Sequence, residues 1–590
     1  MSVAQGFGQA AFLFFIFASP VSASELSSAR SKIAWQDWDQ NAFSKAKADK
    51  KLVLLDLKAI WCHWCHVMDQ TTYQNTKVVD VLNSKYVSVK VDQDSHPELS
   101  RRYEDYGWPA TIIFDAQGNE LMKRSGYIKP EEMAKVLNEL AANPKPLTMD
   151  DERPTAPEKP DAFVASLRAT INSRYDETVG GWKRGHKYLD RYFLEDQLQL
   201  AASGNEVARK RARQTLDSVR RLVDPIWGGL YQYSVSGNWN EPHYEKIMSY
   251  QADSIQIYSQ AYALLKDERD LQTARKNFEY VELFLSDASG AFYTSQDADV
   301  VPGQHSEEYF GLSDKERRKR GIPRVDQNIY ARENGWMIEA LTHLFSVTGD
   351  EKILKRALAA AEWIMQNRSL PGGGFRHGVN DARPYLGDSL SMARAFVALY
   401  AATGERVWLK RAEETTIFIN KTFRLKSGGF LSAPEEKSVL KPKPNADENI
   451  SFARLMASLH HLTGKPLYHE LGQSAFSFAK QSDALDRIYL IAGLLLAENE
   501  LREQPVHMTV VGSKTDVNAR ELYRAALGYP AIYKRLEWLD RAEGPLPNPD
   551  VTYPEMKTAS AFICTGNRCS IPMKKASELP AQTDRILQRK

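Results

Sequence analysis

Hydrophobic and polar positions divide the chain into three parts with different periodicities. Between residues 30 and 143, short apolar runs that fit buried strands alternate with amphipathic stretches that fit helices. The predicted strands cover residues 51–57, 86–92, 112–115 and 120–124, and the predicted helices cover residues 35–50, 67–83, 97–106 and 130–142. This alternation predicts an α/β sheet covered by helices.

The middle of the chain carries a continuous helical pattern. A proline-rich segment over residues 144–160 precedes it and predicts an extended linker. Paired glycines and aromatic residues then interrupt the helical pattern at intervals of about 50 to 80 residues, near the length of one helical hairpin. These loops cover residues 180–182, 228–231, 290–293, 372–375 and 428–430. Repeated hairpins with such loops resemble the (α/α)6 toroid of six-hairpin glycosidases and sugar epimerases. We therefore expect an all-α toroid over residues 161–500, with an open helical solenoid as the alternative.

The last part of the chain, residues 501–590, returns to a β-type pattern. Val506–Val511 is an apolar run, and Gly512 and a helical pattern over residues 518–527 follow it. Residues 532–539 and 559–564 also fit strands. We expect a small C-terminal α/β appendage on the toroid.

The N-terminus carries an export pattern. An apolar run over residues 10–18 precedes the small-residue segment Ser19–Ala23, which predicts a secretory signal peptide over residues 1–23. An uncleaved anchor or a different start site is the alternative. No later run is long enough to span a bilayer, so we expect a secreted or periplasmic protein without a membrane span after signal removal.

Composition narrows the possible partners. Apolar residues make up 43% and charged residues 26% of the chain, as in ordinary globular proteins. The net charge is +2, and no long run of one sign occurs, so we expect no nucleic-acid partner. The four cysteines form two close pairs, Cys62 with Cys65 and Cys564 with Cys569. In an exported chain, such spacing predicts two local dithiols or disulfides.

The first cysteine pair lies between a predicted strand and a predicted helix. In Cys62-His63-Trp64-Cys65-His66, Cys62 falls at the start of the helix if Cys65 and the following residues are helical. Free backbone N–H groups and the helix dipole stabilise a thiolate there. Such a thiolate attacks disulfides, and Cys65 is placed to resolve the mixed disulfide.

Three other functions fit the same five residues. The sequence also matches the C-x-x-C-H pattern of c-type haem attachment. Two thiolates with His63 or His66 could hold zinc or copper. The pair could also be a fixed structural disulfide. We favour the redox pair, and we expect no cofactor and no metal.

The residues around the pair resemble thioredoxin. Asp56 lies six residues before Cys62, Trp61 precedes the motif, Val89–Asp92 matches the central strand, and Gly107–Thr111 matches the cis-proline loop. The resemblance implies a catalytic set of Cys62, Cys65, Asp56 and Pro109. In that set, Asp56 would move protons and Pro109 would present its backbone to the substrate.

The second pair has a different setting. Cys564 and Cys569, with four residues between them, suit a structural disulfide in a hairpin. Exchange with Cys62 is the sharper alternative, and it requires the two ends of the chain to meet.

Polar residues beside the glycine loops are candidates for a second site. In a toroid, helix starts face the central funnel, where glycosidases keep paired carboxylates. The candidate residues are His243, Glu245, Lys246, Asp297, Asp299 and Asp388. Glu245 with Asp297 or Asp299 could form an acid/base pair in a sugar-binding cavity. Helix capping and ion pairing are the structural alternative.

Two motifs extend the resemblance over nearly the whole chain. The cysteine motif is followed by Pro242-His243-Tyr244-Glu245-Lys246, and later by Gln296-Asp297-Ala298-Asp299. Together they resemble the spermatogenesis-associated protein 20 family, in which a thioredoxin domain precedes a toroid. The segments Arg124–Ile128 and Lys183–Tyr188 depart from that family's pattern, so the first domain is closer to plain thioredoxin.

These observations predict an exported thiol–disulfide oxidoreductase that acts on protein thiols or disulfides, with the toroid binding a partner or ligand. The alternative is a carbohydrate-active enzyme, a hydrolase or an epimerase, whose site in the toroid binds a sugar-like ligand. In that case, the thioredoxin part would sense redox state. A third possibility is a non-catalytic binding protein, which a buried Cys62 would favour.

Overall fold

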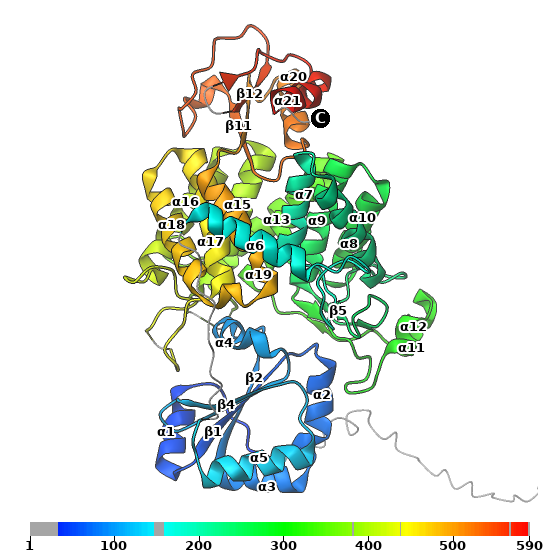
Figure 1. The fold of residues 1–590 in the computed structure, drawn as a ribbon, viewed down its shortest axis with the longest axis vertical. Helices are drawn as coiled ribbons and strands as arrows, with labels where there is room; N and C mark the ends of the chain where they lie inside the picture. The colour runs from blue at the N-terminus through cyan, green and yellow to red at the C-terminus, as the bar shows by residue number, and fades with distance from the viewer. Residues whose placement is uncertain are drawn as a thin grey trace, which may run out of the picture.

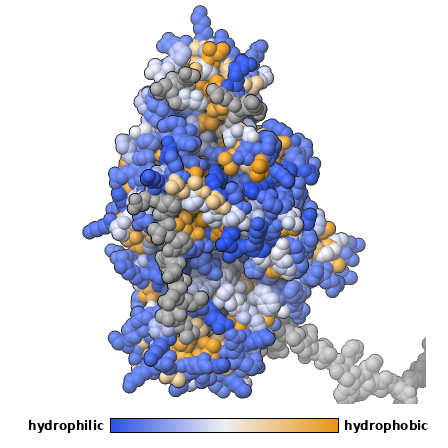
Figure 2. Space-filling view, viewed as in Figure 1, coloured by the Kyte–Doolittle hydropathy of each residue, from blue (hydrophilic) through white to orange (hydrophobic). Residues whose placement is uncertain are grey.

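The computed structural model describes residues 33–146, 159–379, 381, 383–436, 438–565 and 568–587. Three units follow one another along the long axis: an N-terminal α/β domain, a ring of helices and a small C-terminal α/β domain (Figure 1). The predicted signal peptide and residues 147–158 of the predicted linker lie outside the described residues. Within the described ranges, every helix is too short or too polar to cross a bilayer. The face in Figure 2 is mostly hydrophilic, with small scattered apolar patches.

The N-terminal domain is built on a four-stranded sheet with the order β2-β1-β3-β4. β1 pairs with β2 in parallel and with β3 in antiparallel orientation, and β3 pairs with β4 in antiparallel orientation. The strands are β1 (Leu52–Lys58), β2 (Tyr86–Asp92), β3 (Ala110–Phe114) and β4 (Glu120–Ser125). The helices are α1 (Gln40–Asp49), α2 (His63–Gln70), α3 (Thr76–Lys85), α4 (Pro97–Tyr103) and α5 (Pro130–Ala142). β1 is apolar except for Asp56 and Lys58, and its interior residues are buried on both faces of the sheet.

Two predicted helices differ from the structure. The helix predicted over residues 35–50 begins only at Gln40, because the Asp39 side chain accepts the Ala42 N–H and caps that end. The single helix predicted over residues 67–83 is wrong. A 3-10 turn at Thr72–Gln74 separates α2 from α3, and the Asn75 side chain caps the second helix.

Twelve helices of the middle unit form two concentric rings, which confirms the expected toroid. Each inner helix contacts the next, and the last inner helix contacts the first. The inner helices are α7 (Arg191–Ala202), α9 (Met248–Leu265), α13 (Ala331–Thr348), α15 (Leu386–Thr403), α17 (Ala446–Thr463) and α19 (Ile488–Arg502). Their outer partners are, in the same order, α8 (Glu206–Val219), α10 (Glu268–Phe284), α14 (Glu351–Arg368), α16 (Arg406–Phe423), α18 (Pro466–Gln481) and α6 (Pro160–Arg174).

The glycine loops reverse the chain between outer and inner helices. Gly229 has a φ of +77°, and a Cβ there would lie 2.5 Å from the ring of Tyr280. The side chain that packs against this glycine therefore comes from α10, and the close approach requires glycine.

Short elements that the helical pattern did not predict lie in the loops of the toroid. They are β5 (Tyr233–Ser234), β6 (Pro242–His243), β7 (Lys246–Ile247), β8 (Ser295–Gln296), β9 (Val325–Asp326), α11 (Glu307–Phe310) and α12 (Asp314–Arg320). In Figure 1, β5, α11 and α12 lie on the side of the toroid that faces the N-terminal domain.

The C-terminal domain repeats the strand arrangement of the N-terminal domain. Its sheet order is β11-β10-β12-β13, where β10 pairs with β11 in parallel and the other two pairs are antiparallel. The elements are β10 (Val506–Val511), α20 (Val517–Leu527), β11 (Lys534–Leu539), β12 (Ser560–Thr565), β13 (Arg568–Cys569) and α21 (Leu579–Ile586). The expected α/β appendage is confirmed.

Candidate functional site between the first two units

Cys62 lies at the N-terminus of α2, as the sequence predicts. It is the N-cap residue, and its Sγ accepts a hydrogen bond from the Cys65 backbone N–H at 3.2 Å. The two cysteines form a disulfide in this structure. In the reduced protein, the same N–H and the helix dipole would stabilise a Cys62 thiolate.

The loops beside the disulfide are held by specific contacts. Trp61 is buried, and its Nε1 donates to Asp94 Oδ2 at 2.7 Å. The Trp108–Pro109 peptide bond is cis, and the Pro109 carbonyl accepts the Gly126 N–H at 2.8 Å. The predicted cis-proline loop is therefore present.

Asp56 lies in the middle of β1 and is 2% exposed. Burial raises the pKa of this carboxyl, and the charge of Lys90, whose Nζ lies 3.4 Å from Asp56 Oδ2, opposes the shift. The proton-transfer role that the resemblance implies for Asp56 stays a prediction.

A cavity of about 740 Å³ lies between the N-terminal domain and the toroid. Cys62, Trp64 and Trp108 line it from the N-terminal domain. Cys62 is only 4% exposed, and it packs in one apolar cluster with Ile247 and Tyr250 of the toroid. A molecule that reaches Cys62 must therefore enter this cavity.

The candidate residues of the Pro-His-Tyr-Glu-Lys segment have different environments in the structure. His243 and Glu245 line the cavity, and Glu245 Oε2 is buried without a hydrogen-bond partner among the described residues. The His243 ring lies 3.8 Å from that oxygen. Lys246 instead lies fully buried against Asp224, with Nζ 2.8 Å from Oδ2, and burial lowers its pKa to about 8.

Asp388 has a structural environment. It is fully buried, and its Oδ1 accepts the Arg332 backbone N–H and bonds to His377 Nδ1, both at 2.9 Å. His377 in turn donates from Nε2 to the Asp94 carbonyl at 2.7 Å. Asp388 thus helps to hold the N-terminal domain against the toroid, and it is not part of the cavity wall.

Several carboxylates that line the cavity were not identified from the sequence. Asp253, Glu333, Glu339 and Asp447 all line the wall. Burial raises the pKa of Asp253 to about 6. Burial also opposes ionisation of Glu339, but the charge and hydrogen bond of Arg394, together with the charge of Arg191, lower its pKa to about 2. Glu333 and Asp447 lie in the first turns of inner helices. An acidic residue in the first turn of a predicted helix is the sequence feature that could have identified them.

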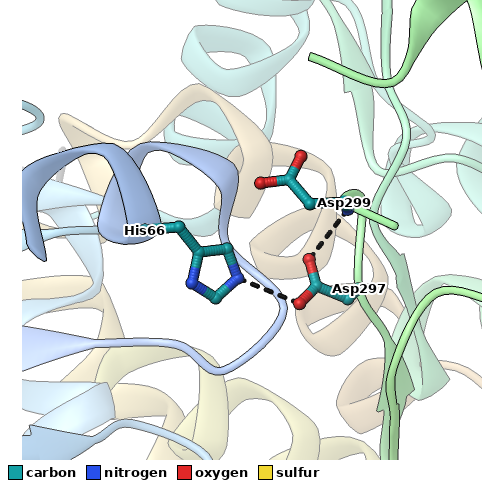
Figure 3. A group of neighbouring side chains, drawn as sticks. All are labelled: His66, Asp297 and Asp299. Atoms are coloured by element: carbon teal, nitrogen blue, oxygen red, sulfur yellow. Dashed lines mark hydrogen bonds and ion pairs between the residues drawn. The ribbon is translucent and has the colours of Figure 1, made fainter. Parts of the chain in front are cut away.

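Asp297 and Asp299 contact the cysteine motif. His66 Nε2 donates to Asp297 Oδ2 at 2.9 Å, as Figure 3 shows, and His63 Nδ1 donates to Asp299 Oδ1 at 2.9 Å. The backbone N–H of Ala298 also donates to the Trp61 carbonyl at 3.3 Å. These two aspartates do not share the cavity wall with Glu245, so the structure does not group the proposed acid/base pair in one cavity.

Burial and neighbouring charges shift the pKa values of His63 and Asp297 in this contact. Burial opposes charge on His63, but the hydrogen bond and charge of Asp299 raise its pKa. Burial also raises the pKa of Asp297, against the effect of His66. The histidines of the motif therefore serve the contact with the toroid rather than the cavity.

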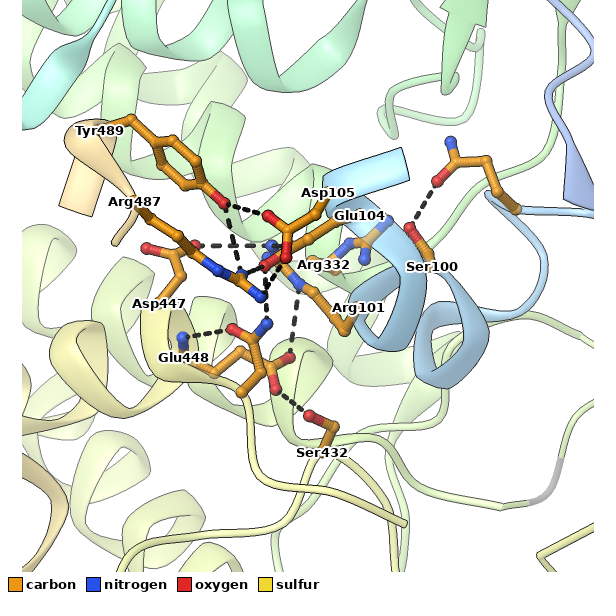
Figure 4. A network of polar contacts seen from close by, with 12 residues as sticks. Ser100, Arg101, Glu104, Asp105, Arg332, Ser432, Asp447, Glu448, Arg487 and Tyr489 are labelled. Atoms are coloured by element: carbon orange, nitrogen blue, oxygen red, sulfur yellow. Dashed lines mark hydrogen bonds and ion pairs between the residues drawn. The ribbon is translucent and has the colours of Figure 1, made fainter. Parts of the chain in front are cut away.

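Helix α4 forms a second polar contact with the toroid (Figure 4). Arg101 Nη1 lies 3.5 Å from Asp447 Oδ2, and Arg487 bonds to both Glu104 and Asp105. The ion pairs are partly buried and are linked through Glu104, which contacts both Arg101 and Arg487, so they form a network between the two units rather than isolated surface pairs.

Cys564 and Cys569 lie in the other α/β domain. They are directly opposed on β12 and β13 and form a disulfide. This domain lies at the far end of the toroid from α2, the helix that Cys62 caps (Figure 1). Direct exchange between the two pairs would therefore require a large rearrangement.

These features define the first unit as a thioredoxin-like domain and the second as an (α/α)6 toroid. The family described as "Protein of unknown function, DUF255", under the name Thioredox_DsbH, matches residues 18–143. The chain is also 33% identical over 109 residues to the thiol:disulfide interchange protein DsbD of Cronobacter sakazakii, covering 18% of this chain and 19% of that protein.

The whole chain is similar to spermatogenesis-associated protein 20 of Homo sapiens. The two sequences are 22% identical over an alignment 730 positions long, which covers 94% of this chain and 90% of the relative. The resemblance inferred from the motifs is confirmed. Among solved structures, cellobiose 2-epimerase of Bacillus thermoamylovorans is 13% identical, with a TM-score of 0.43. That match covers 54% of this chain and 87% of the epimerase.

Proposed function

We propose that this protein is a thiol–disulfide oxidoreductase whose substrate enters the cavity between the thioredoxin-like domain and the toroid. The observation that carries the proposal is the position of Cys62, a helix N-cap in the wall of that cavity. The export pattern of residues 1–23 and the Cys564–Cys569 disulfide support work in an oxidising, extracytoplasmic compartment.

The exchange has two steps. The Cys62 thiolate attacks one sulfur of a substrate disulfide, forms a mixed disulfide and releases the other substrate sulfur as a thiolate. The Cys65 thiolate then attacks Cys62 Sγ, which releases the second substrate thiolate and leaves the Cys62–Cys65 disulfide. Two electrons pass to the substrate, and an external dithiol must return them for turnover. The reverse sequence oxidises a substrate dithiol.

The cover over Cys62 limits the substrate. Ile247 and Tyr250 of the toroid pack against the cysteines, so a folded protein surface cannot reach the sulfur in this arrangement. A small disulfide or an extended peptide segment fits a cavity of about 740 Å³. Among protein substrates, we therefore expect only flexible, extended segments to reach Cys62.

The test compares substrates of different size. Prereduced protein is mixed with hydroxyethyl disulfide, with a short linear peptide carrying a mixed disulfide, and with a folded disulfide protein. We expect fast exchange with the first two and at least tenfold slower exchange with the third. Cys62→Ser should abolish all three reactions, and the Cys564→Ser/Cys569→Ser variant should retain them. Equal rates in wild type and Cys62→Ser would refute the function.

A second candidate function uses the same cavity. Glu245 with an unpaired oxygen and Asp253 with a raised pKa line it together with Tyr233 and Trp336, and carboxylates beside aromatic rings suit a sugar. Incubation with disaccharides tests this. Product formation that survives Cys62→Ser but is lost in Asp253→Asn would favour the carbohydrate enzyme, and no conversion would reject it.

A further inference from the structure

We propose that His66, Asp297 and Asp299 form a binding site for a divalent transition-metal ion between the thioredoxin-like domain and the toroid. The sequence predicted no metal, because neither motif alone supplies a ligand set. The structure brings the cysteine motif and the Asp-Ala-Asp segment together, and Figure 3 shows the three side chains as neighbours.

The spacing of the ligand atoms fits an ion. His66 Nε2 and one oxygen from each carboxylate lie within 4.8 Å of one another, and His66 Nε2 lies 2.9 Å from Asp297 Oδ2. Ligands bound to one metal at about 2.0 to 2.2 Å lie about 3 to 3.5 Å apart. A small side-chain adjustment would therefore let all three atoms bind one ion.

The charge of the site also favours a cation. Asp297 and Asp299 are each 2% exposed. In the described part of the chain, neither carboxylate forms an ion pair with a lysine or arginine, and their ion-pair partners are His66 and His63. Two buried carboxylates without a permanent positive charge beside them are costly, and a divalent ion would compensate both.

Outer contacts already orient the ligands. Asp299 accepts hydrogen bonds from His63 Nδ1 at 2.9 Å and from the Gly303 N–H at 2.7 Å. Asp297 Oδ1 accepts the Asp299 N–H at 2.9 Å. Metal sites commonly have such supporting hydrogen bonds, which fix the carboxylates before the ion arrives.

The donor set selects the class of metal. One imidazole and two carboxylates suit Zn²⁺, Mn²⁺ or Fe²⁺. Copper sites are commonly rich in cysteine, and Ca²⁺ sites use oxygen ligands throughout, so neither ion matches this set as well. Three protein ligands leave positions open for water. Such an ion would join α2, and with it Cys62, to the toroid loop that carries both aspartates.

Titration calorimetry on the full chain tests the site. The protein is stripped with chelator and kept oxidised, so that neither cysteine pair offers a thiolate. We expect wild type to bind one equivalent of ZnCl2 or MnCl2. Asp297→Asn, which keeps an acceptor for His66 but removes the charge, should weaken binding at least tenfold. His469→Gln, at an exposed histidine of α18, should bind as wild type does.

A second readout protects the test from misfolded variants. Co²⁺ added to stripped wild type should give visible absorption bands typical of nitrogen and oxygen ligands, and the bands should vanish in His66→Gln. Circular dichroism should show equal helix content in all variants. If oxidised wild type binds no metal, or if Asp297→Asn and His66→Gln bind as wild type does, the proposal is overturned.

Discussion

The two α/β domains share one sheet arrangement but use their cysteines differently. In both sheets, the first strand pairs in parallel with the second and in antiparallel orientation with the third. In the N-terminal domain, Cys62 follows the first strand and caps a helix, whereas Cys564 and Cys569 face each other on the last two strands. Strand order alone therefore does not make a redox site, because the stabilising N–H groups belong to a helix terminus.

The two domains also dock differently on the toroid. The N-terminal domain presents its cysteine motif and α4 to the toroid through ion pairs that are partly or largely buried. The C-terminal domain uses contacts such as the Tyr523 hydroxyl, which donates to the Ala401 carbonyl at 2.9 Å, and keeps its disulfide away from any described cavity. Docking thus covers the Cys62–Cys65 disulfide, whereas a structural role for the Cys564–Cys569 disulfide stays a prediction.

The largest expected effect separates the two cysteine pairs. Cys65→Ser should trap the mixed disulfide on Cys62 and lower turnover at least 1,000-fold, because no resolving thiol remains. Mass spectrometry after incubation with a small disulfide measures the adduct. Cys569→Ser is the matched variant of the C-terminal pair; it leaves Cys564 without its partner, should form no such adduct on Cys564 and should turn over as wild type does. Equal trapping on Cys62 and Cys564 would remove the distinction.

An intermediate effect concerns docking. Arg487→Ala removes the arginine that Glu104 and Asp105, just after α4, share across the contact with the toroid. The loss should loosen this contact and raise the alkylation rate of reduced Cys62 by a bulky maleimide about tenfold, or about 1.4 kcal/mol. Arg524→Ala is the matched control, since it removes an exposed pair with Glu351 at the other end. No change in Arg487→Ala would mean that docking does not control access.

The last expected effect lies in the C-terminal domain and concerns stability rather than the rate of a cysteine reaction. Burial lowers the pKa of Lys534 to about 7, and its Nζ donates to the carbonyls of Ala526, Leu527 and Tyr529. Above pH 7, the unfolded state binds more protons than the folded state at this lysine. The unfolding free energy should therefore rise with pH from about 7 to 10, by about 1 kcal/mol per unit, and be flat below 7.

Urea unfolding at several pH values between 6 and 9 measures this slope. Lys534→Met should lose the rise between pH 7 and 9, because the titrating group is gone. Lys58→Met, at a lysine whose pKa is raised in the N-terminal domain, should retain it. A slope that persists in Lys534→Met would assign it to another group.

Local chemistry explains which features the sequence could predict. The position of Cys62 at a helix start follows from an apolar strand and a cysteine spacing within ten residues, and Gly229 marks a loop because only glycine fits there. The break between α2 and α3 was missed, because the cap at Asn75 competes with a helical apolar pattern that continues through it.

Contacts between distant segments could not be predicted. His63 and Asp299 lie 236 positions apart, and their pairing depends on how two separately folded units dock. The burial of Cys62 and the wall position of Asp253 have the same origin. The pattern of apolar and polar residues along the chain predicts the elements of each unit, but it does not tell which surface of one unit packs against which surface of the other.

The closure of the toroid has a consequence for biosynthesis. Its first helix, α6, pairs with its last inner helix, α19, so the earliest segment finds its partner only after nearly the whole ring has been made. During translation, α6 lacks the inner helix against which it packs until α19 has been made, and the ring cannot close before then. A chain that terminates before Ile488 would lack α19, and we expect such products to be cleared by proteases rather than to persist as shorter, active forms.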